Sequence, residues 1–257
     1  MCIAVRIILM RLTFYKKNGI LWLRMEEVIL GQFEQAEDMQ IDGLKIVQDT
    51  RLYRFTSDSV LLSKFARVKK DDVVADFCAG SGIVGYHLYA LHKNRLHNLK
   101  FTLFEMQASL MHLAKKTAKL NGFENFSFVE GKLQDIPETY REQFSLIVCN
   151  PPYERGGFDN ECYEKAVCRK EITLNLEEIA KACAFALKFG GRVAMLHRAD
   201  RVAELVYTLK KYRIEVKRLQ FVCGKDGDKP YLVMVEGIKG GKPAVEVLPT
   251  ICNVREN

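Results

Sequence analysis

The sequence lacks the cysteine patterns that mark zinc sites and disulfide-rich domains. Its eight cysteines are scattered over 257 residues, with no CxxC pair and no cysteine–histidine cluster at the spacing that binds zinc. We therefore expect free thiols in a reducing compartment, and we expect no metal ion.

Long apolar runs are missing as well. The segment 3–10 is apolar but is interrupted by Arg6, and neither a small-residue cleavage site nor a long hydrophobic stretch follows it. This pattern predicts neither a signal peptide nor a membrane span, so we expect a cytoplasmic protein with no membrane partner. Met25 opens the stretch MEEVILGQ, which is typical of a cytosolic start. Residues 1–24 are therefore either part of the protein or lie upstream of its true start.

No block of lysine and arginine is long enough to form a nucleic-acid-binding tail by itself. The charge is nevertheless positive overall, with 39 lysines and arginines against 32 acidic residues and a formal net charge of +7. Basic side chains that neutralise phosphates gain affinity because counterions are released. The composition is therefore compatible with a polyanionic partner, and equally with a basic protein that binds none.

What the sequence does contain is a regular alternation of strand-like and helix-like segments from residue 71 onward. Short β-rich apolar runs alternate with longer stretches of helical period, the pattern of a mostly parallel sheet with helices on both faces. The length suffices for one such domain with small extensions. The fold class is thus α/β. We divide the chain into an N-terminal extension (1–42), a preceding strand and helix (43–70) and a main domain (71–257).

Seven strands and four helices are predicted in the main domain. The strands are 73–77, 100–105, 126–130, 144–150, 192–197, 214–222 and 231–237, and the helices are 83–92, 107–120, 176–189 and 200–212. The pairs Asn121-Gly122 and Gly190-Gly191 are expected to end two of these helices. The turn 224–229 is too short for a crossover helix, so the last two strands should form an antiparallel hairpin. The prediction is a seven-stranded, mostly parallel sheet whose last strand is reversed.

The segment 73–82 (VVADFCAGSG) has the order of a nucleotide-type cofactor site, with a strand, an acid, a glycine turn and then a helix. Gly80 and Gly82 allow a sharp turn and a close approach of the backbone to a ligand, and Asp76 can accept hydrogen bonds from an ammonium group. A third glycine completes the pattern GxGxxG, and Glu105 at the end of the next strand can bind ribose hydroxyls. The loop alone therefore leaves methyl transfer and hydride transfer open.

The most informative segment is the apolar strand 144–150, which ends abruptly in Asn150-Pro151-Pro152-Tyr153. Two prolines cannot continue a strand ladder, so the strand stops there. The prolines also fix the backbone. They can hold the Asn150 side-chain oxygen and the Pro151 carbonyl at the carboxyl edge of the sheet, beside the glycine loop.

This arrangement suits methylation of an amine whose lone pair is delocalised into an aromatic ring or an amide. Two acceptors that grip both hydrogens favour a pyramidal nitrogen and aim its lone pair at an electrophilic methyl group. We expect Asn150 and the Pro151 carbonyl to be these acceptors and Tyr153 to stack on the flat substrate. Because no strong base is required, His197 is interpreted as a structural residue.

A polar, glycine-containing stretch, 154–160, follows the motif. It is either a mobile lid over a flipped base or a plain connection. Arg155, Arg169 and Lys170 on this rim, together with Arg198, are candidates for phosphate contacts. For any one of them, a solvated surface charge explains the residue equally well.

Taken together, these residues resemble the bacterial tRNA(Val) adenine-N(6) methyltransferase family, which has the Rossmann-like class I methyltransferase fold. The pattern DxxxGxG around Asp76 matches the methyltransferase motif whose acid faces the amino-acid end of the cofactor. Other matching segments are LKIVQ (44–48), YRFTSDSVLL (53–62), LKFGGR (187–192), LHR (196–198), VEG (235–237) and KGG (239–241). The resemblance runs from about Gly43 to Gly241.

This resemblance implies S-adenosyl-L-methionine as the cofactor, tRNA as the partner and the adenosine beside the anticodon as the target. The cofactor-binding residues that it implies are Phe55, Thr56, Asp76, Cys78, Ala79, Gly80, Gly82, Glu105, Met106, Leu133, Asp135 and Asn150. Two positions depart from the family. Lys132 stands where relatives often carry the acid that binds the cofactor's adenine, which leaves Asp135 as a substitute. Lys170 stands where they often carry histidine.

Four other functions remain open. Release-factor glutamine methyltransferases also use NPPY on an amide, but they usually carry a sizeable helical domain before the cofactor loop, where this chain has a short, partly β-like segment. DNA adenine and ribosomal RNA methyltransferases share the motif, although sequence-selective DNA enzymes need recognition domains that are missing. A silent RNA-binding module is the non-enzyme alternative, and the intact Asp76 and NPPY motif argue against it. We expect a monomer or a weak homodimer.

Overall fold

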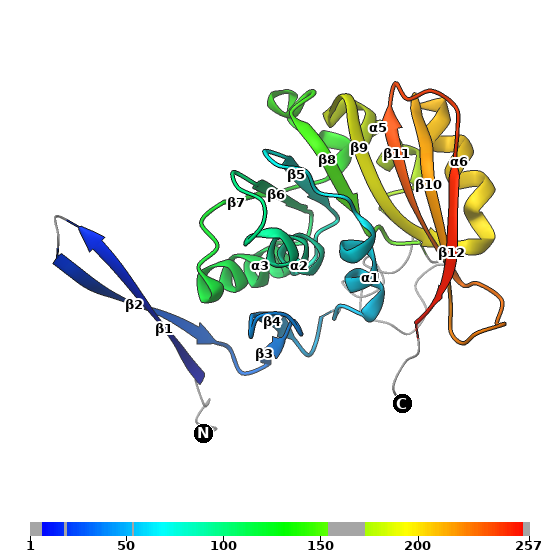
Figure 1. Cartoon of the computed structure of the whole chain (residues 1–257). Coiled ribbons are helices and arrows are strands. Elements are labelled where there is room, and N and C mark those ends of the chain that lie inside the picture. Colours follow the sequence, from blue (N-terminus) through cyan, green and yellow to red (C-terminus); the bar gives the residue numbers. More distant parts are fainter. Residues whose placement is uncertain (1–6, 18–19, 53, 154–172, 254–257) are drawn as a thin grey trace.

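The computed structural model describes residues 7–17, 20–52, 54–153 and 173–253. Its main body is a sheet with helices on both faces (Figure 1). The strands of this sheet are β5 (Val73–Phe77), β6 (Lys100–Glu105), β7 (Phe126–Glu130), β8 (Phe144–Cys149), β9 (Leu187–Arg198), β10 (Ile214–Cys223), β11 (Leu232–Lys239) and β12 (Glu246–Cys252). The helices are α1 (Ser57–Phe65), α2 (Ile83–His92), α3 (Ala108–Asn121), α5 (Leu176–Ala186) and α6 (Val202–Lys211), with short 3-10 turns η1 (Leu133–Asp135), η2 (Glu138–Tyr140) and η3 (Ala199–Arg201).

The strands lie in the order β12-β10-β11-β9-β8-β5-β6-β7. From β9 to β7 all neighbours are parallel, whereas β11 runs antiparallel to both β9 and β10. The predicted α/β fold with a mostly parallel sheet and a reversed final strand in the seven-stranded core is therefore confirmed, as is the hairpin of β10 and β11. An eighth strand, β12, was not predicted; it pairs in parallel with β10 at the sheet edge.

The prediction that Gly190-Gly191 ends a helix is wrong. Helix α5 already ends at Ala186, and both glycines lie inside β9. The register between β8 and β9 shifts at this point, because Phe144 pairs with Leu187 while Leu146 pairs with Arg192. Gly190 has a φ of 75°. The glycines thus form an irregularity in a strand pair, a place that favours glycine as much as a helix end does.

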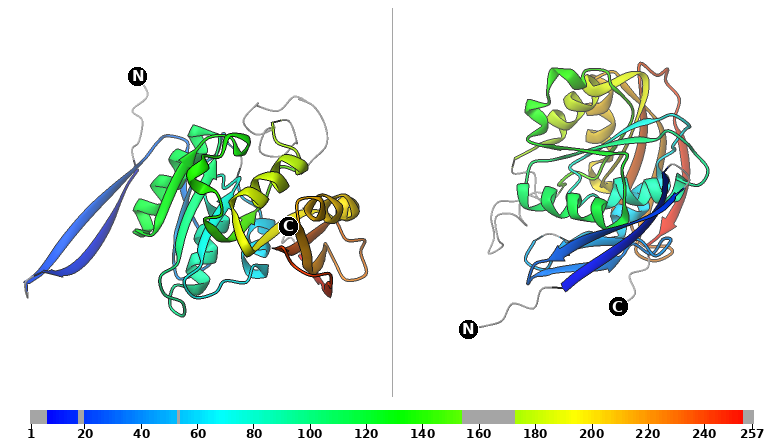
Figure 2. Two further views of the ribbon diagram at one scale, coloured as in Figure 1. Left: turned by 90° about the horizontal axis from the view of Figure 1, so that it is seen from above. Right: turned by 90° about the vertical axis from the view of Figure 1, so that its left-hand side faces the viewer.

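The N-terminal extension (1–42) contains three strands among its described residues. Strands β1 (Ile7–Lys17) and β2 (Ile20–Leu30) form an antiparallel hairpin that projects from the body of the molecule (Figures 1 and 2). Strands β3 (Glu34–Asp38) and β4 (Lys45–Asp49) form a second pair, in which β4 is the strand of the segment 43–70. Helix α3 holds β4 through a hydrogen bond from the Val47 amide to Thr117 Oγ1 of 2.9 Å.

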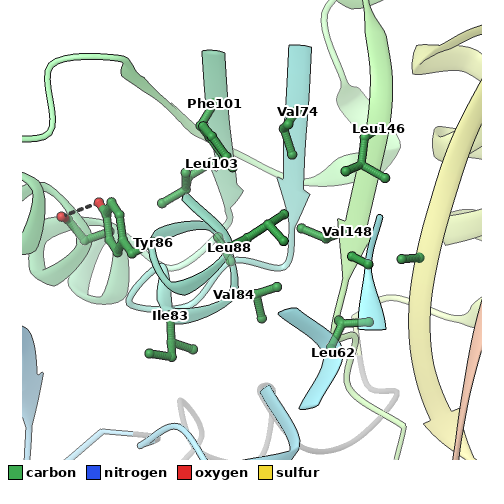
Figure 3. Close-up of a cluster of buried hydrophobic side chains, with 14 of the residues drawn as sticks. Leu62, Val74, Ile83, Val84, Tyr86, Leu88, Phe101, Leu103, Leu146 and Val148 are labelled. Atoms are coloured by element: carbon green, nitrogen blue, oxygen red, sulfur yellow. Dashed lines mark hydrogen bonds between the residues drawn. The ribbon is translucent and has the colours of Figure 1, made fainter. Parts of the chain in front are cut away.

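Apolar side chains alternate between the two faces of the sheet, as the two-residue period of strands requires. Val74 and Val148 pack with α1 and α2 on one face, and Ala75 and Ile147 pack with α5 and α6 on the other. Figure 3 shows the first of these layers, with Leu62 of α1 near the strands. The helices are therefore fixed to the sheet by its pattern of buried residues.

The amino ends of the central strands are joined by a buried ion pair. Arg192 Nη2 lies 2.7 Å from Asp72 Oδ2, and both side chains are almost inaccessible to solvent. The Ser145 hydroxyl donates to the other oxygen of Asp72 at 2.6 Å, and Arg192 also donates to the Arg67 carbonyl. A buried pair of this kind is satisfied only with such additional hydrogen bonds. The carboxyl ends of the same strands are left to form the site.

Candidate active site

A cavity of about 470 Å³ lies at the carboxyl ends of β5, β6, β7 and β8. Its volume falls in the range of small-molecule sites. The strand order reverses between β5 and β8, which is the place where open α/β sheets bind ligands. The predicted site residues that line it are Phe55, Thr56, Cys78, Ala79, Gly80, Glu105, Met106, Leu133, Asn150, Pro151, Pro152 and Tyr153.

The glycine loop after β5 forms one wall of the cavity. Gly80 has a φ of 57°, and a Cβ added there would meet no atom within 4 Å among the described residues, so the backbone is open to a ligand. Gly82 has a φ of 90°, and an added Cβ would collide with Tyr86 and come within 2.8 Å of Leu103. Gly82 is therefore required by the turn and its packing and is absent from the cavity lining within the described part of the chain.

Asp76 lies behind the loop and not in the cavity wall. It is 1% exposed, and its Oδ2 accepts a hydrogen bond from the Gly85 amide at 2.8 Å. Its Oδ1 is buried and has no hydrogen-bond partner among the described residues. Burial raises the pKa of Asp76 to about 7, against the opposing effect of the Gly85 hydrogen bond. The carboxyl group thus supports the loop and keeps one acceptor unused.

Glu105 ends β6 and faces the cavity in a fixed orientation. Its Oε2 accepts from the Gly80 amide at 2.8 Å and its Oε1 from the Gln107 amide at 2.9 Å. Burial raises the pKa of Glu105, while these amides lower it. Each carboxylate oxygen keeps a second lone pair, so the side chain can still accept hydrogen bonds from ligand hydroxyls.

The NPPY motif contributes to the cavity lining a residue with an unsatisfied acceptor, Asn150. Asn150 Nδ2 donates to Ser59 Oγ of α1 at 3.0 Å. Asn150 Oδ1 is buried, and no described residue donates a hydrogen bond to it. Pro151 and Pro152 are buried. Such an acceptor is costly unless a ligand supplies its donor.

The Tyr153 ring lies 6.0 Å from the His197 ring between centroids. His197 is fully buried, and burial lowers the pKa of its imidazole to about 4. The ring is therefore neutral near pH 7. This fits the interpretation of His197 as a structural residue, because a group with so low a pKa is a weak base.

Other predicted residues lie apart from the cavity. Asp135 is exposed on η1, and the side chains that line the cavity in its region are Lys132, Leu133 and Gln134. Arg198 is exposed and forms a two-pronged ion pair with Asp200, at 3.0 and 2.6 Å. Arg155, Arg169 and Lys170 lie outside the described residues, as does the segment 154–160.

Sequence reasoning missed residues that reach the cavity from two further segments. Thr50, Leu52 and Arg54 come from the chain between β4 and α1, and Ser59 comes from the first turn of α1. Thr173 and Leu174 come from the chain before α5. Thr173 Oγ1 lies 3.4 Å from Met106 Sδ, and its carbonyl accepts from Gln134 at 2.7 Å. The string YRFTSDSVLL was a signal for the first segment; no pattern marked the second.

The comparisons with known proteins decide the family. The sequence profile described as "Methyltransferase small domain" matches residues 56–203, which is more than half of the chain. The chain belongs to the methyltransferase small domain family. This methyltransferase is 24% identical over 184 residues to the tRNA1(Val) (adenine(37)-N6)-methyltransferase of Shewanella baltica, a match that covers 69% of this chain and 75% of the relative.

Solved structures with little sequence identity share the fold of the methyltransferase. A predicted O-methyltransferase from Agrobacterium tumefaciens superposes with a TM-score of 0.60 at 18% identity, over 76% of this chain and 86% of the other. TYW2 from P. horikoshii superposes with a TM-score of 0.56 at 14% identity, over 84% and 75%. The fold is therefore the Rossmann-like methyltransferase fold.

The cofactor of this methyltransferase is S-adenosyl-L-methionine, and the cavity fits it. Phe104, Met106, Leu133 and Leu174 give an apolar wall for a flat ring, and Glu105 gives a carboxylate for hydroxyls. Thr56 Oγ1 is a further buried atom that no described residue satisfies. Among the described residues, no cluster of three or more metal-binding side chains is arranged to hold an ion, and no described helix is long and apolar enough to cross a membrane.

Proposed function

We propose that this methyltransferase modifies the exocyclic N6 amine of adenine in tRNA, at the adenosine next to the anticodon of tRNA(Val). The observation that carries the proposal is the side chain of Asn150, which belongs to the cavity lining and whose buried Oδ1 has no donor among the described residues. The named relatives support the substrate, and the net charge of +7 suits a polyanion.

The chain's own residues would activate the amine by hydrogen bonding. Asn150 Oδ1 accepts one amine hydrogen and the Pro151 carbonyl accepts the other, which favours a pyramidal nitrogen with a directed lone pair. When bound, S-adenosyl-L-methionine supplies an electrophilic methyl group on its sulfonium. The nitrogen would be positively charged directly after it receives the methyl group. In this cationic form it is a strong acid and would lose one proton to water, so the neutral His197 is not needed as a base.

The cofactor and the base would be held by different parts of the cavity. Glu105 accepts hydrogen bonds from the ribose hydroxyls, and Gly80 lets the backbone approach the cofactor. The ionised Asp76 favours the cofactor's ammonium group electrostatically. Tyr153, which borders the same cavity as Asn150, stacks on the adenine. The rim residue Lys132 is exposed and available to the RNA backbone.

The proposal is tested by offering several acceptors to one enzyme preparation. Purified protein is incubated with radiolabelled methyl donor and separate pools of tRNA, ribosomal RNA, DNA and release factor. Label in tRNA as N6-methyladenosine is expected. Label in release factor or DNA alone would overturn the substrate while keeping the chemistry, and no label in any pool would favour the silent binding module.

Two alanine variants make that experiment specific. Asn150→Ala removes the proposed acceptor and should abolish labelling. Because the family resemblance also implies Asn150 in cofactor binding, labelling is measured at a cofactor concentration that saturates each protein. Asn175→Ala removes another asparagine side chain, the one that caps α5 by accepting from the Glu178 amide at 2.9 Å. It should lower stability by about 1 kcal/mol and leave methylation unchanged.

A further inference from the structure

Ser59 lies in the first turn of α1, 91 positions before Asn150 in sequence and in direct contact with it. Its side chain is 2% exposed and lines the same cavity. Its Oγ accepts the hydrogen bond from Asn150 Nδ2 at 3.0 Å. Ser59 therefore holds the donor end of an amide whose acceptor end, Oδ1, has no donor among the described residues.

The direction of the amide matters for the reaction. An asparagine side chain has a carbonyl oxygen at one end and an NH2 group at the other. With Nδ2 bound to Ser59, the oxygen is left for the two-hydrogen amine of the acceptor. The reversed amide would present N–H groups to the N–H groups of the substrate, and no hydrogen bond would form. A buried Nδ2 that lost Ser59 would also lack a partner, which penalises the productive orientation.

The first turn of α1, which carries Ser59, is hydrogen-bonded to residues next to β11 and β12. The Tyr231 hydroxyl donates to Asp58 Oδ1 at 3.2 Å, and Asn253 Nδ2 donates to Ser57 Oγ at 2.9 Å and to Asp58 Oδ1 at 3.2 Å. Asn253 directly follows β12, and its backbone amide donates a hydrogen bond to the Cys223 carbonyl at 2.8 Å. The additional edge strand thus brings a residue that fixes the first turn of α1.

We propose that Ser59 is a positioning residue for methyl transfer, which acts by holding the Asn150 amide with its oxygen toward the acceptor amine. The inference rests on the proposed role of Asn150, but it holds for any acceptor that offers an NH2 group. Ser59 contributes to the rate of the chemical step and not to cofactor affinity, because its hydrogen bond is made to Asn150.

Helix α1 offers a matched control for this role. Ser63 lies one turn further along and is 0% exposed. Its Oγ donates to the Val60 carbonyl at 2.7 Å and lies 2.7 Å from His87 Nδ1. Ser63 is absent from the cavity lining within the described residues. Ser59→Ala and Ser63→Ala therefore each remove one buried serine Oγ from α1. Only the Oγ of Ser59 contacts Asn150.

The experiment compares wild type, Ser59→Ala, Ser59→Cys and Ser63→Ala. Methyl transfer is measured at saturating cofactor and RNA, and cofactor affinity is measured separately by calorimetry. Ser59→Ala should lower kcat by about 10- to 100-fold and leave the cofactor Kd within about twofold of wild type. Ser59→Cys fills the same space with a weaker acceptor and should give an intermediate kcat. Ser63→Ala should leave both quantities unchanged.

Two results would overturn the inference. One is a Ser59→Ala kcat equal to that of Ser63→Ala. The other is a parallel loss of kcat and cofactor affinity in both Ser59 variants, which would mean that the cavity had collapsed. The substrate that the wild-type protein methylates distinguishes a failure of this inference from a failure of the proposed function. If it methylates a protein amide instead of tRNA, the tRNA proposal fails, and the same four proteins are compared on that amide.

Discussion

Replacing Asp76 by asparagine should stabilise the cofactor-free protein at neutral pH, although Asp76 belongs to the loop that forms the site. The side chain is 1% exposed, and one carboxylate oxygen has no hydrogen-bond partner among the described residues. Burial raises its pKa from the usual 3.8 to about 7. The ionised carboxylate is thus a cost to the folded state, and an uncharged amide avoids that cost.

The sign and size of the effect follow from proton linkage. The folded protein binds the proton more tightly than the unfolded chain, so stability is full below pH 3.8 and is lost as the pH rises toward 7. At 1.36 kcal/mol per pKa unit, the whole loss is on the order of 4 kcal/mol. About 2–3 kcal/mol of it falls between roughly pH 5 and pH 8. Asp76→Asn has no carboxyl group to ionise at this position, so its stability does not fall in this way.

Urea denaturation of both proteins without cofactor measures the effect. At each pH, the free energy of unfolding of wild type is subtracted from that of Asp76→Asn. This difference should be about 2–3 kcal/mol larger at pH 8 than at pH 5. The new Nδ2 lacks an acceptor and costs about 1–3 kcal/mol, but this cost is the same at both pH values and cancels. Asp135→Asn, at an exposed position, controls for the loss of one charge. A relative stability that does not change with pH would refute the reasoning.

Three further predictions concern the cofactor, the loop and the substrate. The Kd for S-adenosyl-L-methionine should increase as the pH falls below about 7, because an ammonium group favours the ionised Asp76, and calorimetry should find this dependence lost in Asp76→Asn. Gly82→Ala should lower the free energy of unfolding by at least about 1–3 kcal/mol in denaturation experiments, since its φ is 90° and Tyr86 occupies the space. In steady-state kinetics, Tyr153→Ala should raise the KM for RNA by roughly 5- to 150-fold because stacking is lost. Tyr153→Phe keeps the ring and should leave this KM unchanged.

Each of these has an outcome that contradicts it. A cofactor Kd with the same pH dependence in wild type and Asp76→Asn would remove Asp76 from cofactor binding. A Gly82→Ala protein as stable as wild type would show that Tyr86 can move aside at no cost. Equal KM values for Tyr153→Ala and Tyr153→Phe would mean that the ring does not stack on the base.

Much of the fold could be predicted because its pattern is local. The strands β5, β6 and β7 are short apolar runs between turn residues, and their predicted bounds coincide with those of the structure. Strand β12 gave no such signal. It contains Pro249 and is mostly exposed, as an edge strand can be. The pair Gly190-Gly191 was ambiguous, because glycine fits a strand irregularity as well as a helix end.

The candidate site could be predicted where one segment holds all the necessary residues. Asn150 to Tyr153 and the loop around Gly80 each combine a strand end with a rigid or glycine-rich turn, and parallel strands bring such ends together. Ser59 could not be found this way, since its contact with Asn150 joins two distant segments and depends on how α1 packs. Likewise, the sequence placed Asp76 beside the cofactor but could not show that it lies behind the loop.

The most direct test of adenine methylation through Asn150 is nucleoside analysis of tRNA(Val) after incubation with enzyme and methyl donor. The tRNA is digested and its modified nucleosides are identified by mass spectrometry, with wild type and Asn150→Ala run in parallel. Wild type should yield N6-methyladenosine at the position beside the anticodon. At a cofactor concentration that saturates each protein, Asn150→Ala should yield at least about 100-fold less. Methylation at another atom, or undiminished N6-methyladenosine from Asn150→Ala, would contradict the proposed role of the NPPY motif.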